Sequence, residues 1–293
     1  MNYIIEKADL TDLAIDLEIR KLIKAAFQEK HLLNEGHIYN NIHSYASKPS
    51  FILVAKENNL IIGCNAFIAN DFFYNGNQYV GYQSCWTATH PEHQGKKVFF
   101  NIIGEAKKLL LEEKAGFIYG LPNDNSRPIF VKKLGFVEFE NVISRVFNIP
   151  FFHLKYFNQA INFSKKDAIE IDEFQVLTHK KIQNKNKIIE IWHEKCFIWG
   201  KIEMRNKFGI SYSVFLVGGL KFDDTNSIKT MFNCILKKYK VSFIEIVSCK
   251  SNSQNIILKK WKPVKSMNGI IYFNINMPNH QFINLMLGAI DIF

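Results

Sequence analysis

The chain has 293 residues, of which 47% are hydrophobic and 14% aromatic, with only 7 prolines. This composition is typical of a globular protein with a sizeable core, and it excludes disordered, collagen-like and mucin-like chains. The first residues, MNYIIEKADLTDL, mix charges with apolar residues and contain no long hydrophobic run. They exclude an ordinary secretory signal or a spanning helix, so we expect a cytoplasmic protein without membrane attachment.

The formal net charge is +10, and the sequence pI is about 9.2. Such a balance favours an anionic partner. The lysines are scattered over the whole chain, however, and no helix carries a dense basic stripe, which argues against nucleic-acid binding and fits a basic site for an anionic small molecule. The five cysteines lie far apart in apolar runs without a CxxC pair, so we expect reduced core residues and no metal site.

The first half of the chain alternates between helix and strand signals. Helices are predicted where apolar residues recur every three to four positions, and strands where apolar and β-branched runs end at turns such as Asn58–Asn59. Thr11 or Asp12 can cap the first helix, and Gly135 can close the last one. The expected elements, in chain order, are a strand at 3–7, a helix at 12–28, a helix near 35–45, strands at 51–57, 60–69, 72–74 and 78–89, a helix at 98–113, a strand at 117–121, a helix at 128–134 and a strand at 136–149.

A basic loop, HPEHQGKK at 90–97, joins the long strand to the helix that starts at Val98. A helix N-terminus exposes unpaired backbone N–H groups and the positive end of the helix dipole. Gly95 allows the backbone to approach a ligand closely, and Lys96 and Lys97 add positive charge at the same place. The junction therefore predicts a phosphate-binding loop, with an ordinary basic strand-to-helix turn as the alternative.

Two linked motifs resemble the GCN5-related N-acetyltransferase (GNAT) superfamily. HPEHQGKK is similar to the Pro-Glu-Tyr-Arg-Gly-Lys-Gly-like loop after the family's fourth strand, and LPNDNSRPIFVKKLGF at 121–136 is similar to its later Asn-rich turn, short helix and Leu-Gly-Phe. The resemblance implies an α/β (α+β) fold with a mixed, mostly antiparallel central sheet. It also implies acyl transfer to a primary amine from acyl-coenzyme A, either acetyl-coenzyme A or a longer acyl donor.

The sequence departs from the family pattern at two places. Lys97 stands where the family has glycine, and Phe99 stands where it has a small residue. Many members also place a tyrosine in the short helix to protonate the departing thiolate, whereas Phe130 and Val131 occupy that part of the helix here. Neither side chain can donate a proton.

The resemblance implies a coenzyme site between the fourth and fifth strands, which separate in this family. Pro122 is consistent with that separation, because proline interrupts ladder pairing. The predicted cofactor-binding residues are Thr87 and Thr89 on the strand, Gln94, Gly95, Lys96, Lys97 and Val98 in the loop, and Asn123, Asn125 and Ser126 in the later turn. For the last three, simple turn chemistry is the alternative.

The predicted catalytic residues are His90, Tyr82 and Ser126, and the predicted substrate-binding residues are Trp86, His37 and Tyr119. Proton transfer leaves alternatives open, including a water chain to a remote acid. Other candidate bases lie near the loop or in the helical region that lines the acceptor site in this family: Glu92, His93, His31, His37 and His43.

The expected acceptor is a small molecule. Proteins of this length with a PNxxS turn and an appended second half resemble acyltransferases of bacterial surface-sugar pathways, which implies the amino group of a dTDP- or UDP-linked amino sugar. The alternatives are aminoacyl transfer, as in the double-GNAT peptidoglycan enzymes, and acylation of an aminoglycoside or polyamine, which the net charge disfavours. A non-catalytic acyl-coenzyme A sensor is the non-enzyme alternative, and a homo-oligomer is left open.

The second half of the sequence is similar to the first. The sequence of the segment that starts at Ser242 is similar to that of the segment that starts at Gly116. Upstream, a strand at 211–220 leads into a helix at 227–240, which matches the strand, loop and helix of the first half. The intervening junction contains Asp223 and Asp224, which would repel a pyrophosphate. We therefore expect an acyl-coenzyme A-binding GNAT domain at 1–150 and a degenerate GNAT-like domain without cofactor at 151–293, with chance similarity as the alternative.

Overall fold

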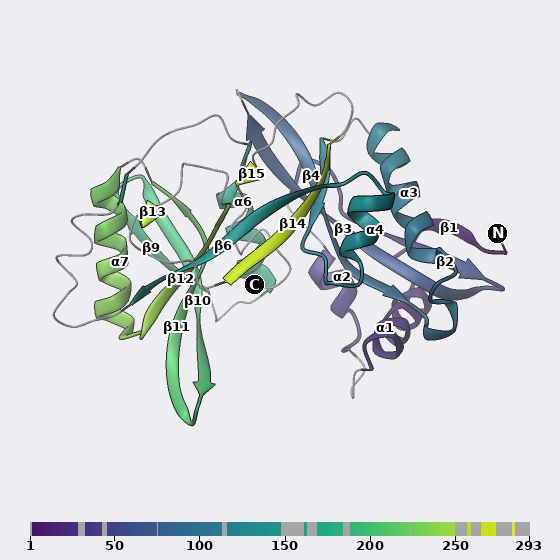
Figure 1. The fold of residues 1–293 in the computed structure, drawn as a ribbon, viewed down its shortest axis with the longest axis horizontal. Coiled ribbons are helices and arrows are strands. Elements are labelled where there is room, and N and C mark those ends of the chain that lie inside the picture. Colours follow the sequence, from purple (N-terminus) through teal and green to yellow (C-terminus); the bar gives the residue numbers. More distant parts are fainter. Residues whose placement is uncertain are drawn as a thin grey trace. The chain divides into compact units, whose positions relative to one another are not determined.

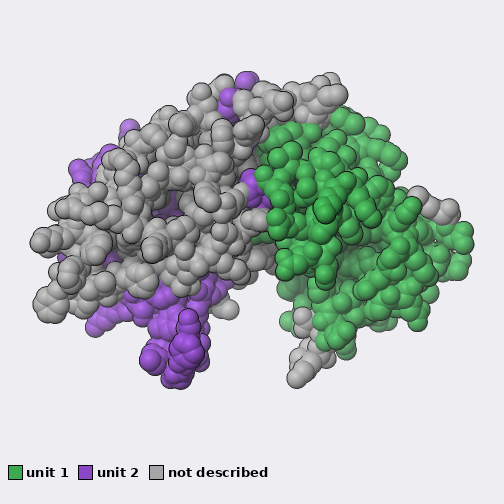
Figure 2. All heavy atoms as spheres, in the orientation of Figure 1, with its two compact units in different colours: residues 1–71, 79–138, 270–279 green, residues 72–78, 139–269, 280–293 purple. Residues whose placement is uncertain are grey.

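The computed structural model describes residues 2–28, 33–42, 46–74, 76–112, 116–147, 161–162, 169–183, 188–222, 224–249, 257–258, 265–273 and 283–284. The chain forms two compact units, which Figure 2 colours separately. Unit 1 comprises residues 1–71, 79–138 and 270–279, and unit 2 comprises residues 72–78, 139–269 and 280–293.

Unit 1 contains most of the elements that the first half predicts (Figure 1). They are β1 (Ile4–Lys7), α1 (Leu13–Phe27), α2 (His37–Ile42), β2 (Phe51–Glu57), β3 (Leu60–Tyr74), β4 (Asn77–Thr89), the 3₁₀ turn Pro91–His93, α3 (Val98–Glu112), β5 (Phe117–Gly120), α4 (Arg127–Lys133) and the start of β6 (Val137–Phe147). The strands predicted at 60–69 and 72–74 are one strand, because Asn70 and Asp71 are buried with polar partners and do not form a turn. Asp71 accepts a 2.8 Å hydrogen bond from the Ser47 hydroxyl.

Local capping explains where the helices begin and end. Asp12 caps α1 by accepting a hydrogen bond of 2.8 Å from the backbone N–H of Ala14, as predicted. α4 ends at Leu134, and Gly135 follows with φ +71°, the left-handed conformation expected after a helix.

The sheet of unit 1 has apolar cores on both faces. β2, β3 and β4 send alternate side chains to opposite sides, so Leu53 packs with α3 and α4 whereas Ile52 packs with α1 and α2. The core under α3 and α4 includes Ile102, Phe130 and Ile270, and β4 passes between the two cores. The loop after β4 is therefore held by packed elements on either side of the sheet.

Unit 2 has its own strands, helices and apolar core. They are β7 (Ile161–Asn162), β8 (Ile169–Ile171), α6 (Glu173–Gln183), β9 (Ile189–His193), β10 (Cys196–Lys207), β11 (Ile210–Lys221), α7 (Thr225–Tyr239), β12 (Phe243–Cys249), β13 (Ile257–Leu258), most of β14 (Lys265–Phe273) and β15 (Ile283–Asn284). β9, β10 and β11 are antiparallel neighbours, and β11 pairs in parallel with β12. Ile228 and Phe232 of α7 are fully buried in the core of this unit.

The ladder registers have the spacing that an internal repeat would give, and they reveal an exchange of strands. On β5, Phe117 pairs with Phe273 of β14, which comes from the C-terminal half of the sequence. On β12, Phe243 pairs with Phe147 of β6, which comes from the N-terminal half. Phe243 − Phe117 and Phe273 − Phe147 are both 126 residues, so each pairing reproduces the other in the same register.

No helix in the described part of the chain is both long and apolar enough to cross a membrane. Cys64, Cys85, Cys196 and Cys234 form no disulfide within the part of the chain that the structure describes.

Candidate functional site

β4 extends beyond the end of β5, and the stretch by which it does so, residues 84–89, is called the β4–β5 gap. The described parallel pairing joins Gly81–Gln83 to Phe117–Tyr119 and goes no further. β4 continues to Thr89, whereas β5 ends at Gly120. The backbone of residues 84–89 therefore runs on beyond its partner, as expected for strands that separate around an extended ligand.

β4 is distorted inside this stretch. Trp86 has φ +47°, a left-handed conformation that costs a residue other than glycine roughly 1 kcal/mol. The thiol of Cys64 on β3 donates to the Trp86 carbonyl at 3.5 Å. Burial raises the pKa of Cys64 to about 12, so this thiol stays protonated and remains a donor. Such strain is characteristic of functional sites.

A buried polar cluster supports the same stretch of β4. Asn65, which is 0% exposed, places its side-chain amide 3.1 Å from the Ser84 hydroxyl and accepts a hydrogen bond from the Thr87 hydroxyl. Thr87 is a predicted cofactor-binding residue, and its side chain is thus committed to Asn65, leaving its backbone for a ligand. Sequence reasoning missed Asn65, although an asparagine within the apolar run Ile61–Ile68 was a signal.

The loop after β4 turns sharply into α3. The His90 N–H makes the last sheet bond, 2.9 Å to the Ile62 carbonyl, and the His90 Nδ1 accepts from the Glu92 N–H at 3.4 Å. His93 Nε2 lies 3.0 Å from a carboxylate oxygen of Glu57. These contacts fix the start of the loop, and they place His90 in a capping role at this turn.

The residues that follow form an exposed turn with two left-handed positions. Gln94, Gly95, Lys96 and Lys97 are all exposed, and Gly95 has φ +77° with no atom within 4 Å of an added Cβ. Lys97 has φ +63°, so the lysine at the family's glycine position adopts the left-handed conformation that glycine would take. Lysine at position 97 is therefore compatible with a left-handed backbone there, at a cost of roughly 1 kcal/mol.

The first turn of α3 presents backbone donors beside these lysines. The first bond into the helix runs from the Asn101 N–H to the Lys97 carbonyl at 3.0 Å, which leaves the N–H groups of Val98, Phe99 and Phe100 ahead of the helical ladder. The first turn contains no acidic residue. Positive backbone and side-chain charge coincide there, as an anion requires.

Packing explains the bulky residues at this helix start. Val98 is 1% exposed and fills the space above Gly63, where an added Cβ would lie 2.5 Å from a Val98 methyl. The ring of Phe99 stands edge-on to Phe130 at 5.1 Å, so the departure at Phe99 joins the start of α3 to α4. Phe130, at the position of the absent tyrosine, is buried.

The turn before α4 is organised by Asn123. Its Oδ1 accepts hydrogen bonds from the N–H of Asn125 at 3.1 Å, the N–H of Ser126 at 2.9 Å and the Ser126 hydroxyl at 3.0 Å. Turn chemistry therefore occupies the Asn123 oxygen and engages the Ser126 hydroxyl. Asn125 is exposed.

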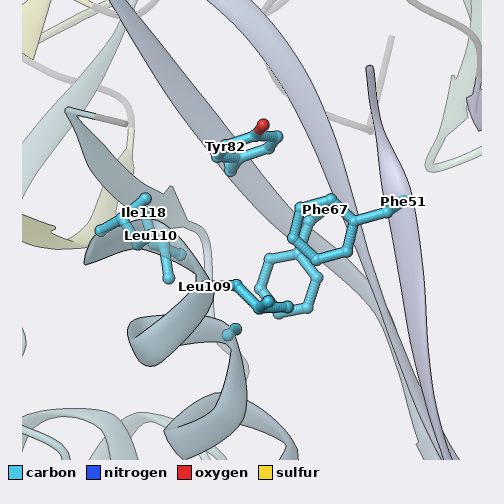
Figure 3. A pocket seen from close by; sticks show the side chains of 7 residues that line it. Phe51, Phe67, Tyr82, Leu109, Leu110 and Ile118 are labelled. Atoms are coloured by element: carbon cyan, nitrogen blue, oxygen red, sulfur yellow. The ribbon is translucent and has the colours of Figure 1, made fainter. Parts of the chain in front are cut away.

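Two predicted site tyrosines lie in the interior. Tyr82 is 1% exposed and closes a hollow with Phe51, Phe67 and Ile118 that has no room for a water molecule (Figure 3). Tyr119 is 1% exposed, and its hydroxyl accepts a 2.9 Å hydrogen bond from Asn70. Both side chains have packing roles here, and the catalytic role of Tyr82 and the substrate-binding role of Tyr119 stay predictions.

The other two predicted substrate-binding residues lie close together. The rings of His37 and Trp86 are 6.1 Å apart between centroids, on the face of the sheet that α1 and α2 cover. Burial lowers the pKa of His37, Asp16 opposes this effect, and Arg20 adds to it. His31 and His43 lie outside the described residues.

The equivalent junction in unit 2 is shorter. Three residues, 222–224, separate β11 from α7, whereas eight residues, 90–97, separate β4 from α3. Asp224 caps α7 by accepting from the N–H groups of Asn226 at 2.6 Å and Ser227 at 3.0 Å, and these bonds, led by those with Ser227, lower the pKa of Asp224. Asp223 lies outside the described residues. A carboxylate of the chain itself thus accepts from backbone N–H groups at the start of α7.

Among the described residues, no group of three His, Cys, Asp or Glu side chains is arranged to hold a metal ion. The donors at the β4–α3 junction are instead backbone N–H groups and lysines, which suit phosphate. The amide groups along residues 84–89 suit a ligand that itself contains amides. These two observations together fit acyl-coenzyme A, whose pyrophosphate and pantetheine arm carry those groups.

No protein-family model and no curated protein sequence matches the chain, but solved structures do. A GCN5-related N-acetyltransferase from Anabaena variabilis is similar at a TM-score of 0.61 and 12% identity, covering 92% of this chain and 72% of that one. A probable N-acyltransferase of unknown function from Enterococcus faecalis gives 0.62 at 12% identity over 93% and 73% of the two chains. A putative acetyltransferase from Pyrococcus horikoshii gives 0.53 at 13% identity over 99% and 95%. The chain therefore has the GNAT fold, which confirms the fold predicted from its two motifs.

Proposed function

We propose that the chain is an acyl-coenzyme A-dependent N-acyltransferase with one coenzyme site, formed by residues of the first half. The observation that carries this proposal is the coincidence of the β4–β5 gap with the loop Gln94–Val98 at the start of α3. Either feature alone is common in α/β proteins. An extended amide-lined gap that leads to a phosphate-binding helix start matches one ligand class, the acyl-coenzyme A thioesters.

In this proposal the N–H groups of Gly95 and Val98 bind the pyrophosphate, and Lys96 and Lys97 supply its counter-charge. The backbone at Thr87 and Thr89 pairs with the pantetheine amides, and a β4 N–H near Trp86 stabilises negative charge on the thioester oxygen. Asn123, Asn125 and Ser126 support the opposite edge of the coenzyme. The protein thus holds the acyl carbon beside the acceptor amine, so no covalent enzyme intermediate is required.

For the acceptor we propose a nucleotide-linked amino sugar. Trp86, half-buried at the edge of the gap, offers a ring for stacking a sugar or base, and the net charge of +10 favours an anionic diphosphate over a polycation. Transfer of an aminoacyl group is the second candidate within the same reaction class. A cytoplasmic location belongs to this proposal.

The experiment is a thiol-release assay with acetyl-coenzyme A and longer acyl donors against UDP- and dTDP-linked amino sugars, together with calorimetry of coenzyme A binding. Turnover with a nucleotide-linked amino sugar supports the proposal. If the protein binds coenzyme A tightly but acylates no amine, the result supports a non-catalytic sensor instead. The sensor alternative is favoured by Phe130, which is buried where many family members have a proton-donating tyrosine. Absence of coenzyme binding refutes the site.

A further inference from the structure

A buried charged pair lies on the face of the sheet that α1 and α2 cover. Asp16 and Arg20 face each other across one turn of α1, with 2.7 Å between Asp16 Oδ2 and Arg20 Nε and side chains that are 2% and 7% exposed. A second guanidinium nitrogen of Arg20 donates to the Leu33 carbonyl at 2.8 Å, just ahead of α2. Burying such a pair gives little net stability, so a buried pair in this position calls for another explanation.

The pair has one unused acceptor. Asp16 Oδ1 is buried and has no hydrogen-bond partner within the described part of the chain. An orphaned carboxylate oxygen in an apolar core is costly unless something with a proton or a positive charge comes to it. Asp16 is therefore prepared to stabilise a positive charge that arises during function.

His37 is the neighbouring group that can acquire such a charge. It is the first residue of α2, is half-buried and interacts electrostatically with both Asp16 and Arg20 of α1. On the β4 side its ring meets Trp86, which carries no charge. Burial lowers the His37 pKa below its ordinary value of 6.5, so the ring is neutral at pH 7 and can accept a proton.

Trp86 relates the position of His37 to the proposed position of the thioester. It is the strained residue of β4 within the stretch that runs beyond β5, where the proposed function places the thioester. Its ring lies 6.1 Å from the imidazole. The imidazole thus borders the place where an acceptor amine would approach.

We propose that His37 is the general base of the transfer and that the Asp16–Arg20 pair is its positioning device, an inference that rests on the proposed function. His37 removes the proton that the acceptor nitrogen loses as its lone pair forms the N–C bond and the C–S bond breaks. The thiolate that leaves receives a proton from solvent, and the imidazolium returns its proton to solvent. Asp16 stabilises the imidazolium, and Arg20 holds Asp16 in place.

The test compares His37→Gln, Asp16→Asn and Arg20→Gln in the full chain, with His193→Gln as the matched control from unit 2. Thiol release from acetyl-coenzyme A is followed against pH with the best acceptor of the panel above. General base catalysis contributes about 10²–10⁴-fold, so we expect His37→Gln to lower kcat by at least 100-fold with KM for acetyl-coenzyme A within twofold. His193→Gln leaves both constants unchanged.

The pH profile separates a proton-transfer role from a structural one. The base must be neutral, so activity falls as the pH drops through the His37 pKa, below about 6.5. Asp16→Asn removes a charge that raises this pKa and shifts the acid limb to lower pH, whereas Arg20→Gln shifts it to higher pH. An NMR titration of the His37 imidazole in the unaltered protein must give the same midpoint, and it remains informative if a core variant fails to fold.

Three outcomes overturn the inference. A loss of kcat of less than threefold in the His37→Gln variant overturns the inference and leaves the proposed function intact. The same holds if the NMR midpoint of His37 lies more than one pH unit from the midpoint of the acid limb of activity. Wild-type protein that binds coenzyme A but acylates no amine removes the proposed function itself, and this inference with it.

Discussion

Replacing Gly95 by aspartate tests the proposed phosphate-binding loop with a matched control inside the same chain. Gly95 and Gly209 have the same φ of +77°, and an added Cβ meets no atom within 4 Å at either site. Gly209 lies in the β10–β11 hairpin, outside the proposed site. Each change to aspartate therefore imposes a similar backbone cost, roughly 1 kcal/mol, and only Gly95→Asp adds charge beside the pyrophosphate.

The expected loss of affinity follows from Coulomb's law. Two unit charges 4 Å apart repel by about 1 kcal/mol in water and about 4 kcal/mol at an effective dielectric of 20. The loop is exposed, so the lower value applies, and two phosphate charges raise it to about 2 kcal/mol before screening by salt. Because 1.4 kcal/mol is a factor of ten, we expect about 10- to 30-fold weaker coenzyme A binding by Gly95→Asp.

Isothermal calorimetry at low and high salt measures this effect, and urea unfolding reports the stability of both variants. The loss of affinity shrinks as salt rises, because the repulsion is screened. Gly209→Asp keeps wild-type affinity, and Lys21→Glu, at an exposed position on α1, controls for net charge. If Gly95→Asp binds coenzyme A as tightly as Gly209→Asp does, the loop is not the phosphate site.

Three further predictions concern the support of the site. Gly63→Ala places a methyl 2.5 Å from the stiff Val98 side chain, so we expect the free energy of unfolding in urea to fall by about 1–3 kcal/mol. Adding Val98→Ala to the same chain should largely restore it. An unchanged free energy of unfolding in the single variant contradicts this packing. Ile270→Ala removes a side chain that is 1% exposed in the core of unit 1, so we expect urea unfolding to show a loss of about 2–5 kcal/mol, and a loss below 0.5 kcal/mol would be evidence against the strand exchange. With a pKa of about 12, Cys64 has roughly 10⁻⁴ of its thiol ionised at pH 8, so iodoacetamide labels it only after denaturation, and rapid labelling of the native protein rules out its burial.

Local signals made the turn after β4 and the start of α3 predictable. Gly95, the two lysines and the apolar spacing from Val98 lie within one short segment, and each has a direct conformational meaning. The departures at Lys97 and Phe99 could not be judged from sequence, because their outcome depends on a backbone dihedral and on a ring of α4. The structure shows that both are accommodated.

Long-range partners were beyond the reach of the sequence. β6 and β14 are equivalent strands of the repeat, so nothing local indicates that Phe273 pairs with Phe117 while Phe147 pairs with Phe243. Asn65 likewise looked like a polar interruption of an apolar strand, and its role depends on Thr87, which is 22 residues away in the chain. The burial of Tyr82 was likewise not visible in the sequence, whereas the chemistry of its side chain was.

We infer that one half of this chain binds acyl-coenzyme A and the other does not. Calorimetric titration of the full chain with coenzyme A tests this inference most directly. We expect one molecule bound per chain, with an affinity that Gly95→Asp weakens and Asp224→Asn leaves unchanged, because Asp224 caps α7 in unit 2 and takes no part in the β4–α3 junction. Two molecules per chain, or none, would contradict it.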